Sequence, residues 1–598
     1  MSTLRQLYRI LSPRERRQAL WLLPLLIATA LMQVVGIASV TPFLAVVADP
    51  GAVERHESLR RLYELGGFTE VRTFLLALGA LMFVVIVGSN GLTAISTWAV
   101  LRFSWMRSHT IAVRILRGFL ARPYLFFLEQ HSADLGRNLL GEVVQIVTGT
   151  LVPAMKAVSG AIAALAVMAL LVYVDPLLAC LTAVVMGGAY GALFFAIRRR
   201  QRRMGQVRLA ANKGRFKTLA ETFGGIKEVK LLGREATMVR RFQRPSADYA
   251  AATALNAVVA QVPRFALEGI AFGGIVLMVL YLLRREAGFE AIVPTIGLYA
   301  LAGYRLMPSL QQIFHGLTNI RFNSAALDHL SEYLPAAEVD FGERRPVAPL
   351  PLARSIRLRG VWFQYPTAKE PLFRGLDLEI AAGRSTAFVG ATGSGKSTLG
   401  DLLLGLLRPD RGAIEIDGVP LGDANLRAWQ RNLGYVPQSI FLADDTIARN
   451  IAFGLPDREI DMEAVARAAR AACIDEFIER ELPRGYDTVV GERGVRLSGG
   501  QRQRIGIARA LYHDPQVILF DEATSSLDNV TEEQVLEAVS ALARTRTTIT
   551  IAHRLSTVRG CDRILLLEGG EVVASGTYDE LIASEPRFRT LAMAASGS

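Results

Sequence analysis

The apolar positions of this chain form long runs in its first part and short runs in its second part. Toward the N-terminus, uncharged runs reach the length of about 20 residues that a helix needs to cross a bilayer, and arginine-rich segments separate them. Beyond residue 354 the apolar runs shorten and alternate with glycine-marked turns and helical patterns, which is typical of an α/β domain. The candidate membrane spans are residues 19–48, 73–101, 157–174, 176–197, 265–283 and 291–320.

These patterns predict two domains joined by a linker. We expect an α-helical transmembrane domain with six spans and long cytoplasmic helical extensions in residues 1–334. Residues 335–354 are polar and contain proline, which is typical of a domain linker, and residues 355–598 form the α/β domain. Ordinary single domains are shorter than 598 residues, so the length agrees with this division.

Two connectors between the predicted spans are unusually long. Residues 102–156 and 198–264 contain few turn signals and keep a helical periodicity. We interpret them as spans that continue into the cytoplasm as long helices, joined by short crosswise helices near residues 124–135 and 219–232. A solvated helical hairpin is the alternative interpretation of the second tip.

Two amphipathic segments flank the first span. Residues 1–17 alternate leucine and arginine, which predicts an interfacial helix on the inner membrane surface. A cleavable signal peptide is excluded because the apolar run that follows is far too long. Residues 57–65 place Leu59, Leu62 and Tyr63 on one helical face, as in a short helix at the outer surface. An ordered connector resting on lipid headgroups explains the same pattern.

Composition and charge favour a membrane protein over a nucleic-acid-binding one. Hydrophobic residues make up 51% of the chain, and the mean hydropathy is +0.29. The net charge is +12, but the basic residues cluster beside apolar spans, as in residues 14–17 and 198–203. The orientation rule for membrane proteins accounts for them and places both termini in the cytoplasm. The three dispersed cysteines predict neither a disulfide framework nor a zinc site.

A phosphate-binding loop stands in the α/β domain. Residues 390–398 read Gly-Ala-Thr-Gly-Ser-Gly-Lys-Ser-Thr, between an apolar strand at residues 386–389 and an apolar helix that begins near Lys396. Backbone N–H groups of such a loop converge on an anion, while the lysine reaches the outer phosphates and Ser397 is able to ligate Mg²⁺. The predicted nucleotide contacts are Gly390, Thr392, Gly393, Ser394, Gly395, Lys396, Ser397 and Thr398.

Two further motifs make the signal specific. Leu-Ser-Gly-Gly-Gln occupies residues 497–501, and the apolar strand at residues 517–522 ends in Asp521 and Glu522. With the loop, these motifs resemble those of ATP-binding cassette (ABC) transporters, specifically half-transporters of the exporter type, and the resemblance covers nearly the whole chain. It implies that residues 355–598 form an α/β P-loop ATP-binding cassette domain that hydrolyses ATP to drive transport.

The resemblance implies roles for single residues. Tyr365 would stack on adenine, and Gln438 would sense Mg²⁺ and the attacking water. Asp521 would hold Mg²⁺, Glu522 would act as general base on the water, and His553 would contact the terminal phosphate. Such roles suit phosphoryl transfer, which depends on positioning and charge stabilisation.

The same resemblance implies a dimer. In the family, the segment Ser498, Gly499, Gly500 and Gln501 of one cassette closes over the ATP held by another. Every catalytic element is intact in this chain, which favours a homodimer with two working sites over a heterodimer with one degenerate site.

Two arginines near the inner half of the membrane are candidates for the substrate cavity. Arg264 stands one helical turn before Glu268, and Arg305 precedes Pro308. An arginine in the membrane is costly unless it is paired or lines a wet cavity. They therefore form either a cationic patch for a phosphate or diphosphate, or a structural set in which Arg264 pairs with Glu268 and Arg305 caps a kink at Pro308.

A closer resemblance concerns the substrate. Residues 37–43, 262–270 and 304–309, with the outer amphipathic helix, are similar to the bacterial lipid-linked oligosaccharide flippase and its surface-glycan relatives. The chain departs from that group at Ser89 and Asn90, where a cation can stand. The resemblance implies outward flipping of a polyprenyl-diphosphate-linked oligosaccharide across the inner membrane of a bacterium.

Other functions remain open at this point. The same fold serves exporters of drugs, lipids or peptides. An ATP-gated channel or regulatory subunit is a rival of a different class, for which an eroded catalytic site or an added regulatory insert is expected. The candidate spans exclude a soluble cassette enzyme acting on DNA.

Overall fold

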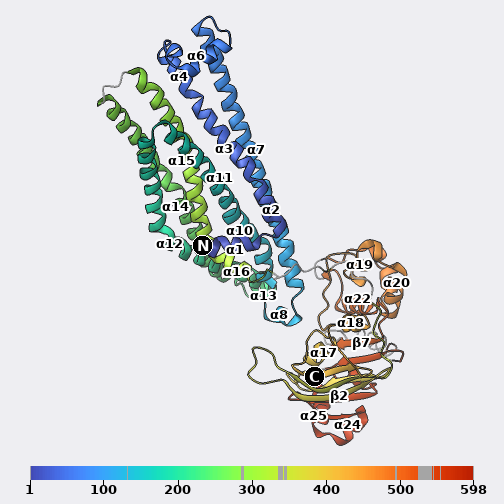
Figure 1. Ribbon diagram of the computed structural model, residues 1–598. Helices are drawn as coiled ribbons and strands as arrows, with labels where there is room; N and C mark the ends of the chain where they lie inside the picture. The colour runs from blue at the N-terminus through green and yellow to red at the C-terminus, as the bar shows by residue number, and fades with distance from the viewer. Residues whose placement is uncertain are drawn as a thin grey trace. The chain divides into compact units, whose positions relative to one another are not determined.

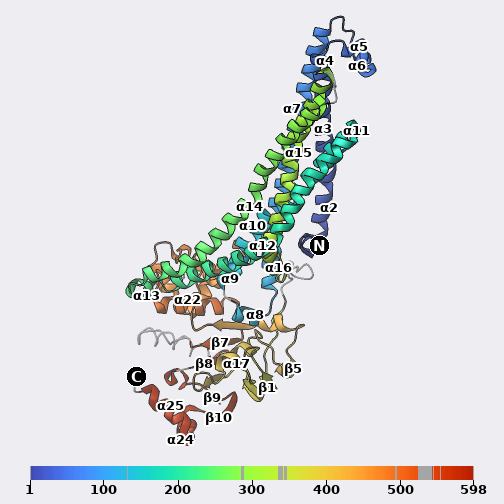
Figure 2. The same cartoon turned by 90° about the vertical axis from the view of Figure 1, so that its left-hand side faces the viewer.

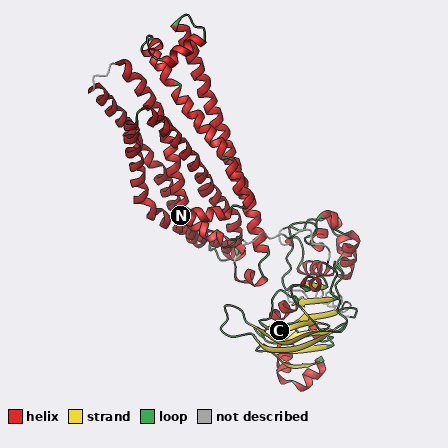
Figure 3. Cartoon of the chain, viewed as in Figure 1, coloured by secondary structure: helices red, strands yellow, loops and turns green. Residues whose placement is uncertain are grey.

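The computed structural model describes residues 2–130, 132–284, 289–334, 341, 347–491, 494–522, 542, 544–552 and 554–596. Contacts divide the chain into two units, each described separately below. The first unit comprises Met1–Arg122 and Phe126–Phe341, and the second comprises Pro123–Leu125 and Gly342–Ser598. The strands all belong to the second unit, and the first is helical (Figure 3). Most of the predicted linker lies outside the described residues.

The N-terminal segment forms a crosswise helix followed by a broken spanning helix. α1 (Ser2–Ile10) ends before Ser12, which caps α2 (Pro13–Trp21) through a reciprocal capping box with Glu15. The interfacial helix predicted for residues 1–17 is therefore two helices, and only the first lies crosswise (Figure 1). The apolar run continues as α3 (Leu23–Ala38) and α4 (Val40–Ala48).

Two short helices follow at the far end of the first span. They are α5 (Ala52–Arg55) and α6 (Glu57–Leu65), and α6 has the bounds predicted from its amphipathic pattern. Leu59 is buried against Phe74, while Leu62 is exposed. The buried face of α6 is therefore narrower than the pattern indicated.

Five long helices make up the rest of the bundle, and several run well past any bilayer (Figures 1 and 2). They confirm that the long connectors are helical extensions of the spans. Their bounds are Val71–Leu120 (α7), Val152–Val174 (α11), Pro176–Gly224 (α12), Glu235–Arg284 (α14) and Phe289–Phe322 (α15).

Short helices form the tips between these long helices. α8 (Tyr124–Glu129) and α9 (Ser132–Gly136) occupy the first tip, and α13 (Ile226–Leu231) occupies the second, after the Gly224–Gly225 break. Both positions agree with the sequence expectation.

The return from the first tip contains π-helical turns, which the sequence did not predict. They cover Arg137–Glu142 and Val147–Leu151 and flank α10 (Val143–Ile146). Val143, Ile146 and Val147 pack with Ile115 of α7 and with α16 (Ser324–Ser331) in one apolar cluster.

Among the described residues, four helical segments are long and apolar enough to cross a membrane. They are Pro13–Ala48, Val71–Leu120, Asp134–Val174 and Pro176–Gly224. The fifth and sixth predicted spans fall on α14 and α15, in which many side chains lie outside the description.

The second unit contains two sheets. The smaller is antiparallel, with order β2-β1-β4-β5. The larger has order β10-β9-β3-β8-β7-β6, and all its pairs are parallel except β10 with β9. The strands are β1 (Ser355–Phe363), β2 (Phe373–Ala381), β3 (Ser385–Val389), β4 (Arg411–Ile416), β5 (Val419–Pro420), β6 (Leu433–Val436), β7 (Val517–Asp521), β8 (Thr547–Ile551), β9 (Arg563–Glu568) and β10 (Glu571–Gly576).

Two apolar clusters lie on opposite faces of β7. Val517 and Leu519 join the cluster of the smaller sheet and α17, whereas Ile518 and Phe520 join the cluster of α19, α20 and α22. This follows from the alternation of side chains along a strand. The helices of this unit are α17 (Lys396–Leu403), α18 (Leu426–Gln430), α19 (Ile447–Ile451), α20 (Met462–Ala471), α21 (Asp475–Arg480), α22 (Gly499–Leu511), α24 (Tyr578–Ser584) and α25 (Pro586–Ser596), with single 3₁₀ turns at Asp457–Glu459, Gly485–Asp487 and Leu555–Val558.

Candidate functional site

The predicted phosphate loop connects the central strand β3 to α17, and its backbone requires glycine. Gly393 and Gly395 have φ values of 84° and 102°, in the left-handed region that side chains with a Cβ rarely adopt. A Cβ on Gly390 would come within 2.1 Å of the carbonyl oxygen of Leu567. The loop therefore leaves its N–H groups and the N-terminus of α17 available to an anion.

The lysine of this loop is held at its centre. Lys396 Nζ donates hydrogen bonds to the carbonyl oxygens of Gly390 (2.8 Å) and Ala391 (3.0 Å), and the side chain is 4% exposed. Burial lowers the pKa of Lys396, while the charges of Glu522 and Asp521 act in the opposite direction. These bonds pre-position the ammonium at the point where an anion held by the loop would add a counter-charge.

The other side chains of the loop differ in exposure. Thr392 and Ser397 are exposed. Ser394 Oγ is buried and has no hydrogen-bond partner among the described residues. A buried hydroxyl without a partner is uncommon, and a bound phosphate would satisfy it.

Tyr365 is bonded to the helix that follows the loop. Its hydroxyl lies 2.9 Å from Thr398 Oγ1, and its ring contacts Phe363 edge-on with centroids 5.0 Å apart. The side chain is thus fixed beside α17, and stacking on adenine stays a prediction.

The carboxylates predicted for catalysis stand at the end of β7. Glu522 has φ 49°, a strained conformation for a residue with a side chain, and its N–H donates to the carbonyl of Ile551. Gln438, just after β6, donates from Nε2 to Glu522 Oε2 at 2.6 Å. The parallel pairing of β6 with β7 thus brings together two residues 84 positions apart.

Sequence reasoning missed an acidic residue beside this pair. Asp401 of α17 is half-buried, and burial together with the charge of Asp521 raises its pKa to about 6. Tyr435 of β6 is bonded to Asp521, and burial with that charge raises the pKa of its hydroxyl. The spacing of Asp401 within the apolar helix offered the only signal, since one carboxylate there interrupts a run of leucines.

The Leu-Ser-Gly-Gly-Gln segment starts α22. Ser498 caps the helix, with its Oγ accepting from Gln501 N at 3.2 Å and its N–H donating to Gln501 Oε1 at 2.8 Å. Gly499 and Gly500 form the first helical turn. α22 packs on one face of β7 and α17 on the other, so the segment and the phosphate loop of one chain belong to opposite faces of the sheet. His553 and residues 523–530 lie outside the described residues.

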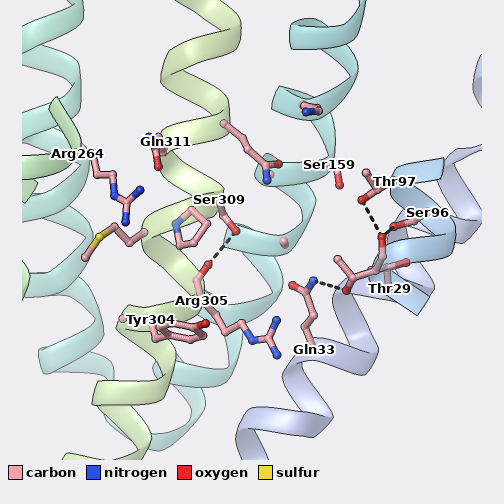
Figure 4. A pocket seen from close by; sticks show the side chains of 18 of the residues that line it. Thr29, Gln33, Ser96, Thr97, Ser159, Arg264, Tyr304, Arg305, Ser309 and Gln311 are labelled. Atoms are coloured by element: carbon pink, nitrogen blue, oxygen red, sulfur yellow. Dashed lines mark hydrogen bonds between the residues drawn. The ribbon is translucent and has the colours of Figure 1, made fainter. Parts of the chain in front are cut away.

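A second candidate site is a cavity of about 840 Å³ inside the helical unit. It is enclosed by α3, α7, α11, α14 and α15, and both predicted arginines line it (Figure 4). Arg305 Nη2 donates to Asn90 Oδ1 at 3.2 Å, and Arg264 Nε donates to Glu268 Oε1 at 2.7 Å. The expected Arg264–Glu268 pair is thus present, whereas Arg305 bonds to the neighbouring helix α7.

The cavity also contains polar residues that sequence reasoning missed. Lys156 of α11 lines it as a third cation. Hydroxyl and amide groups line much of the rest of the cavity, and among them Gln33 Nε2 donates to Thr93 Oγ1 at 3.1 Å. The helical spacing of these residues within apolar spans was an available signal. These hydroxyl and amide groups include Thr29, Gln33, Thr93, Ser96, Thr97 and Ser159, and also Ser309, Gln311 and Gln312 on the helix of Arg305.

Comparison with known protein families gives two matches. The model described as ABC transporter matches residues 373–525, and the model described as ABC transporter transmembrane region matches residues 19–288. Together these ranges contain the phosphate loop, the carboxylates at the end of β7 and the first five predicted spans.

Comparison with curated proteins and solved structures agrees with these matches. The ATP-dependent lipid A-core flippase of Alkalilimnicola ehrlichii is 38% identical over 421 residues, 68% of each chain. That of Ralstonia nicotianae is 34% identical over 486 residues, 79% of each chain. A solved bacterial Atm1-family ABC exporter with ATP bound superposes with a TM-score of 0.77 at 25% identity, covering 96% of this chain and 99% of the other.

Proposed function

This chain belongs to the ABC transporter family as a half-transporter of the exporter type, and on that premise we propose that it flips a glycolipid with a phosphorylated saccharide headgroup. The chain binds ATP and couples its hydrolysis to transport across a membrane. The proposed direction is from the inner to the outer leaflet of the inner membrane of a bacterium, with both termini in the cytoplasm. We assign residues 1–334 to the membrane domain and residues 355–598 to the nucleotide-binding domain.

The observation that carries the proposal is that one cavity combines several cations with many hydroxyl and amide groups. Arg264, Arg305 and Lys156 supply three cations against the single carboxylate of Glu268. Guanidinium groups bind phosphate oxygens in a bidentate manner. The hydroxyl and amide groups of the same cavity offer donors and acceptors to saccharide hydroxyls. A cavity built for apolar drugs would not need so many polar groups within the membrane.

Two substrates of this class follow from different observations. The motif resemblance at residues 37–43, 262–270 and 304–309 supports a polyprenyl-diphosphate-linked oligosaccharide. Relatives named ATP-dependent lipid A-core flippase support a lipid A-core glycolipid. Both substrates combine phosphate with sugar on a lipid, which is the chemistry that the cations and the hydroxyl and amide groups of the cavity suit. An exporter of drugs, other lipids or peptides is the alternative within the same fold.

The proposed hydrolysis site uses the residues around the phosphate loop. Lys396 and the loop backbone at residues 390–398 hold the phosphates, and Tyr365 supports the nucleotide. Glu522 acts as general base on the attacking water, and its bond from Gln438 at 2.6 Å supports this role because it fixes the carboxylate. His553 completes the proposed set.

The same site suits Mg²⁺. The hydroxyl of Ser397, the carboxylate of Asp521 and the amide oxygen of Gln438 are oxygen donors, the ligands that Mg²⁺ prefers. When bound, Mg²⁺ neutralises charge on the phosphate oxygens. Asp521 stands beside Glu522 at the end of β7, so the proposed metal ligand and the proposed base come from adjacent residues.

We propose that the functional form is a homodimer. Ser498, Gly499, Gly500 and Gln501 start α22 on one face of β7, and α17 with the phosphate loop lies on the other. A second copy would therefore bring its own segment to the loop. ATP binding would draw two cassettes together and turn the cavity outward, and hydrolysis would reset it.

A titration of ATPase stimulation tests the assignment of the cavity. Glycolipid added to the reconstituted protein should stimulate hydrolysis, and Arg305→Ala should raise the half-stimulating concentration about tenfold or more, the effect expected from the loss of one charge-assisted contact. Arg305→Lys keeps the charge, so its half-stimulating concentration should lie between those of the wild type and Arg305→Ala. Unchanged stimulation in Arg305→Ala, with basal hydrolysis intact, would exclude the cavity as the headgroup site.

A further inference from the structure

A second basic cavity lies in the helical unit, away from the one assigned to transport. It has a volume of about 360 Å³ and is formed by α2, the segment before it and the C-terminal part of α7. Arg14, Arg107, Arg114 and Arg117 line it, together with His109 and a single carboxylate, Glu15. Four guanidinium groups thus face one acidic side chain. None of these residues takes part in the proposed transport or hydrolysis.

The carboxylate of Glu15 is already saturated. It is 5% exposed and accepts hydrogen bonds from Arg107 Nη1 (2.8 Å), Thr110 Oγ1 (2.6 Å) and the N–H of Ser12 (2.7 Å). Arg114 Nη1 lies 4.0 Å from Oε2 of the same carboxylate. Glu15 therefore fixes Arg107 and Arg114 at the bottom of the cavity and has little capacity to neutralise Arg14 and Arg117, the outer cations.

The outer cations are left without an acidic partner. The structure gives the side chains of Arg14 and Arg117 no hydrogen bond or ion pair with any described residue, and both are exposed, as is His109. Arg14 belongs to α2 and Arg117 to α7, so they approach the cavity from two helices. Arg14 and Arg117 together offer several N–H donors to one anion, since the Glu15 carboxylate already accepts bonds from other groups.

The surroundings place this cavity at the membrane surface. It adjoins the start of the apolar segment Pro13–Ala48, and α1 lies crosswise at the same end of the bundle (Figure 1). Trp21 is 80% exposed, and Trp105 on α7 is also exposed. Exposed tryptophans of this kind mark the boundary between lipid and water. Basic pockets between helices at this level bind the headgroups of anionic lipids.

We propose that this cavity binds the phosphate of an anionic phospholipid headgroup in the cytoplasmic leaflet. Arg14 and Arg117 contact the phosphate oxygens, and Arg107 and Arg114, held by Glu15, line the floor below. The exposed Leu20 and Trp21 on α2 lie against the acyl chains. The bound lipid is a resident ligand that ties α2 to α7, and the site stands independently of which glycolipid is transported.

Native mass spectrometry of the full-length protein tests the proposal. The protein is titrated with phosphatidylglycerol and, separately, with phosphatidylcholine of the same acyl chains. The wild type should bind phosphatidylglycerol more tightly. Arg14→Gln with Arg117→Gln should weaken that binding about tenfold or more, as expected for two cations near a membrane surface. Arg14→Lys with Arg117→Lys should recover most of it.

A matched control separates a site from general charge. Arg17→Gln with Arg102→Gln removes two exposed arginines from the same two helices, neither of which lines the cavity, and it should leave the affinity within about twofold. An equal loss of phosphatidylglycerol affinity in the control, or equal affinity of the wild type for both lipids, would overturn the proposal. Glycerol 3-phosphate that competes as well as the lipid would show a site for a free phosphate and would also overturn it. Arginine variants that elute as the wild type does on size exclusion exclude misfolding as the cause.

Discussion

Glu522 illustrates how the fold places one reactive residue. Its position after β7 gives it a left-handed backbone with φ 49°, and Gln438, just after the adjacent strand β6, donates a hydrogen bond to its carboxylate. Such strain is found where the surrounding structure fixes a residue for function. The pair of carboxylates was predictable from its motif, whereas the direct bond between Gln438 and Glu522 needed the sheet order.

Removal of the Glu522 carboxylate should abolish turnover while leaving nucleotide binding. Glu522→Gln keeps the side-chain shape and loses the base, so the ATPase rate should fall about 10²- to 10⁴-fold. The matched control Glu571→Gln changes an exposed glutamate of β10 and should retain the wild-type rate. ATP hydrolysis by the purified protein, with nucleotide binding measured in parallel, checks the prediction. A variant that hydrolyses ATP at near the wild-type rate would assign the base to another residue.

Asp401 should make the cassette less stable as the pH rises. Its pKa is raised to about 6 in the folded protein, above the unfolded value of about 4. The ionised form is thus disfavoured on folding, and the cost grows as the pH rises from about 4 and is complete above about 6. Asp401→Asn should stabilise the protein at pH 7.5 by about 1 kcal/mol, allowing for partial exposure, and by less at pH 5. Thermal unfolding without Mg²⁺ at both values checks this, and an equal effect at both would contradict it.

Helix extension and helix interruption decide the shape of the first unit. The lengths of α7, α12 and α14 were predictable because their periodicity continues beyond the apolar runs. The π-helical turns at Arg137–Glu142 and Val147–Leu151 were not, because each contains only a single glycine, Gly141 or Gly149, and an isolated glycine does not distinguish a π-helical turn from an ordinary helix. The break between α1 and α2 depends on the Ser12–Glu15 capping box, a signal that was present in the sequence but was overridden by the amphipathic pattern.

A buried ion pair joins the first π-helical turn to α12. Glu142 accepts from Arg208 Nη2 at 2.9 Å and from Asn212 Nδ2 at 2.8 Å, and all three side chains are buried. Glu142→Ala leaves the arginine charge uncompensated and should destabilise the helical unit by about 3–5 kcal/mol. Glu221→Ala, which breaks partly exposed pairs with Lys217 and Arg241, should cost at most about 1 kcal/mol. Thermal unfolding in detergent compares the two, and equal losses would show that burial is not decisive.

The whole molecule depends on a second copy if its hydrolysis sites are shared. The loop that holds Lys396 and the segment that begins at Ser498 lie on opposite faces of β7. The motifs were fully predictable from the sequence, but this opposition follows only from which residues of β7 pack with α17 and which with α22. The cavity was predictable in part, since Arg264 and Arg305 were identified whereas Lys156 and the hydroxyl and amide groups of the lining depend on how five helices meet.

Complementation tests the shared site directly. Lys396→Ala and Ser498→Arg should each inactivate a homodimer. A mixed dimer of the two variants contains one site with both defects and one site with none, so co-expression should restore a measurable part of the ATPase rate. If each chain formed its sites alone, the mixture would stay inactive. Tandem affinity tags on the two variants isolate the mixed dimer and exclude residual wild-type protein.

The most direct measurement of the central claim follows lipid and ATP together in sealed proteoliposomes. Labelled polyprenyl-diphosphate oligosaccharide, lipid A-core glycolipid and phosphatidylethanolamine are each placed in the cytoplasm-equivalent leaflet, with Glu522→Gln as the inactive control. We predict that one or both phosphorylated glycolipids stimulate hydrolysis and leave that leaflet only when ATP is present and Glu522 is intact. Robust hydrolysis with no stimulation and no movement of either glycolipid would contradict the proposed substrate class and leave an exporter of another cargo.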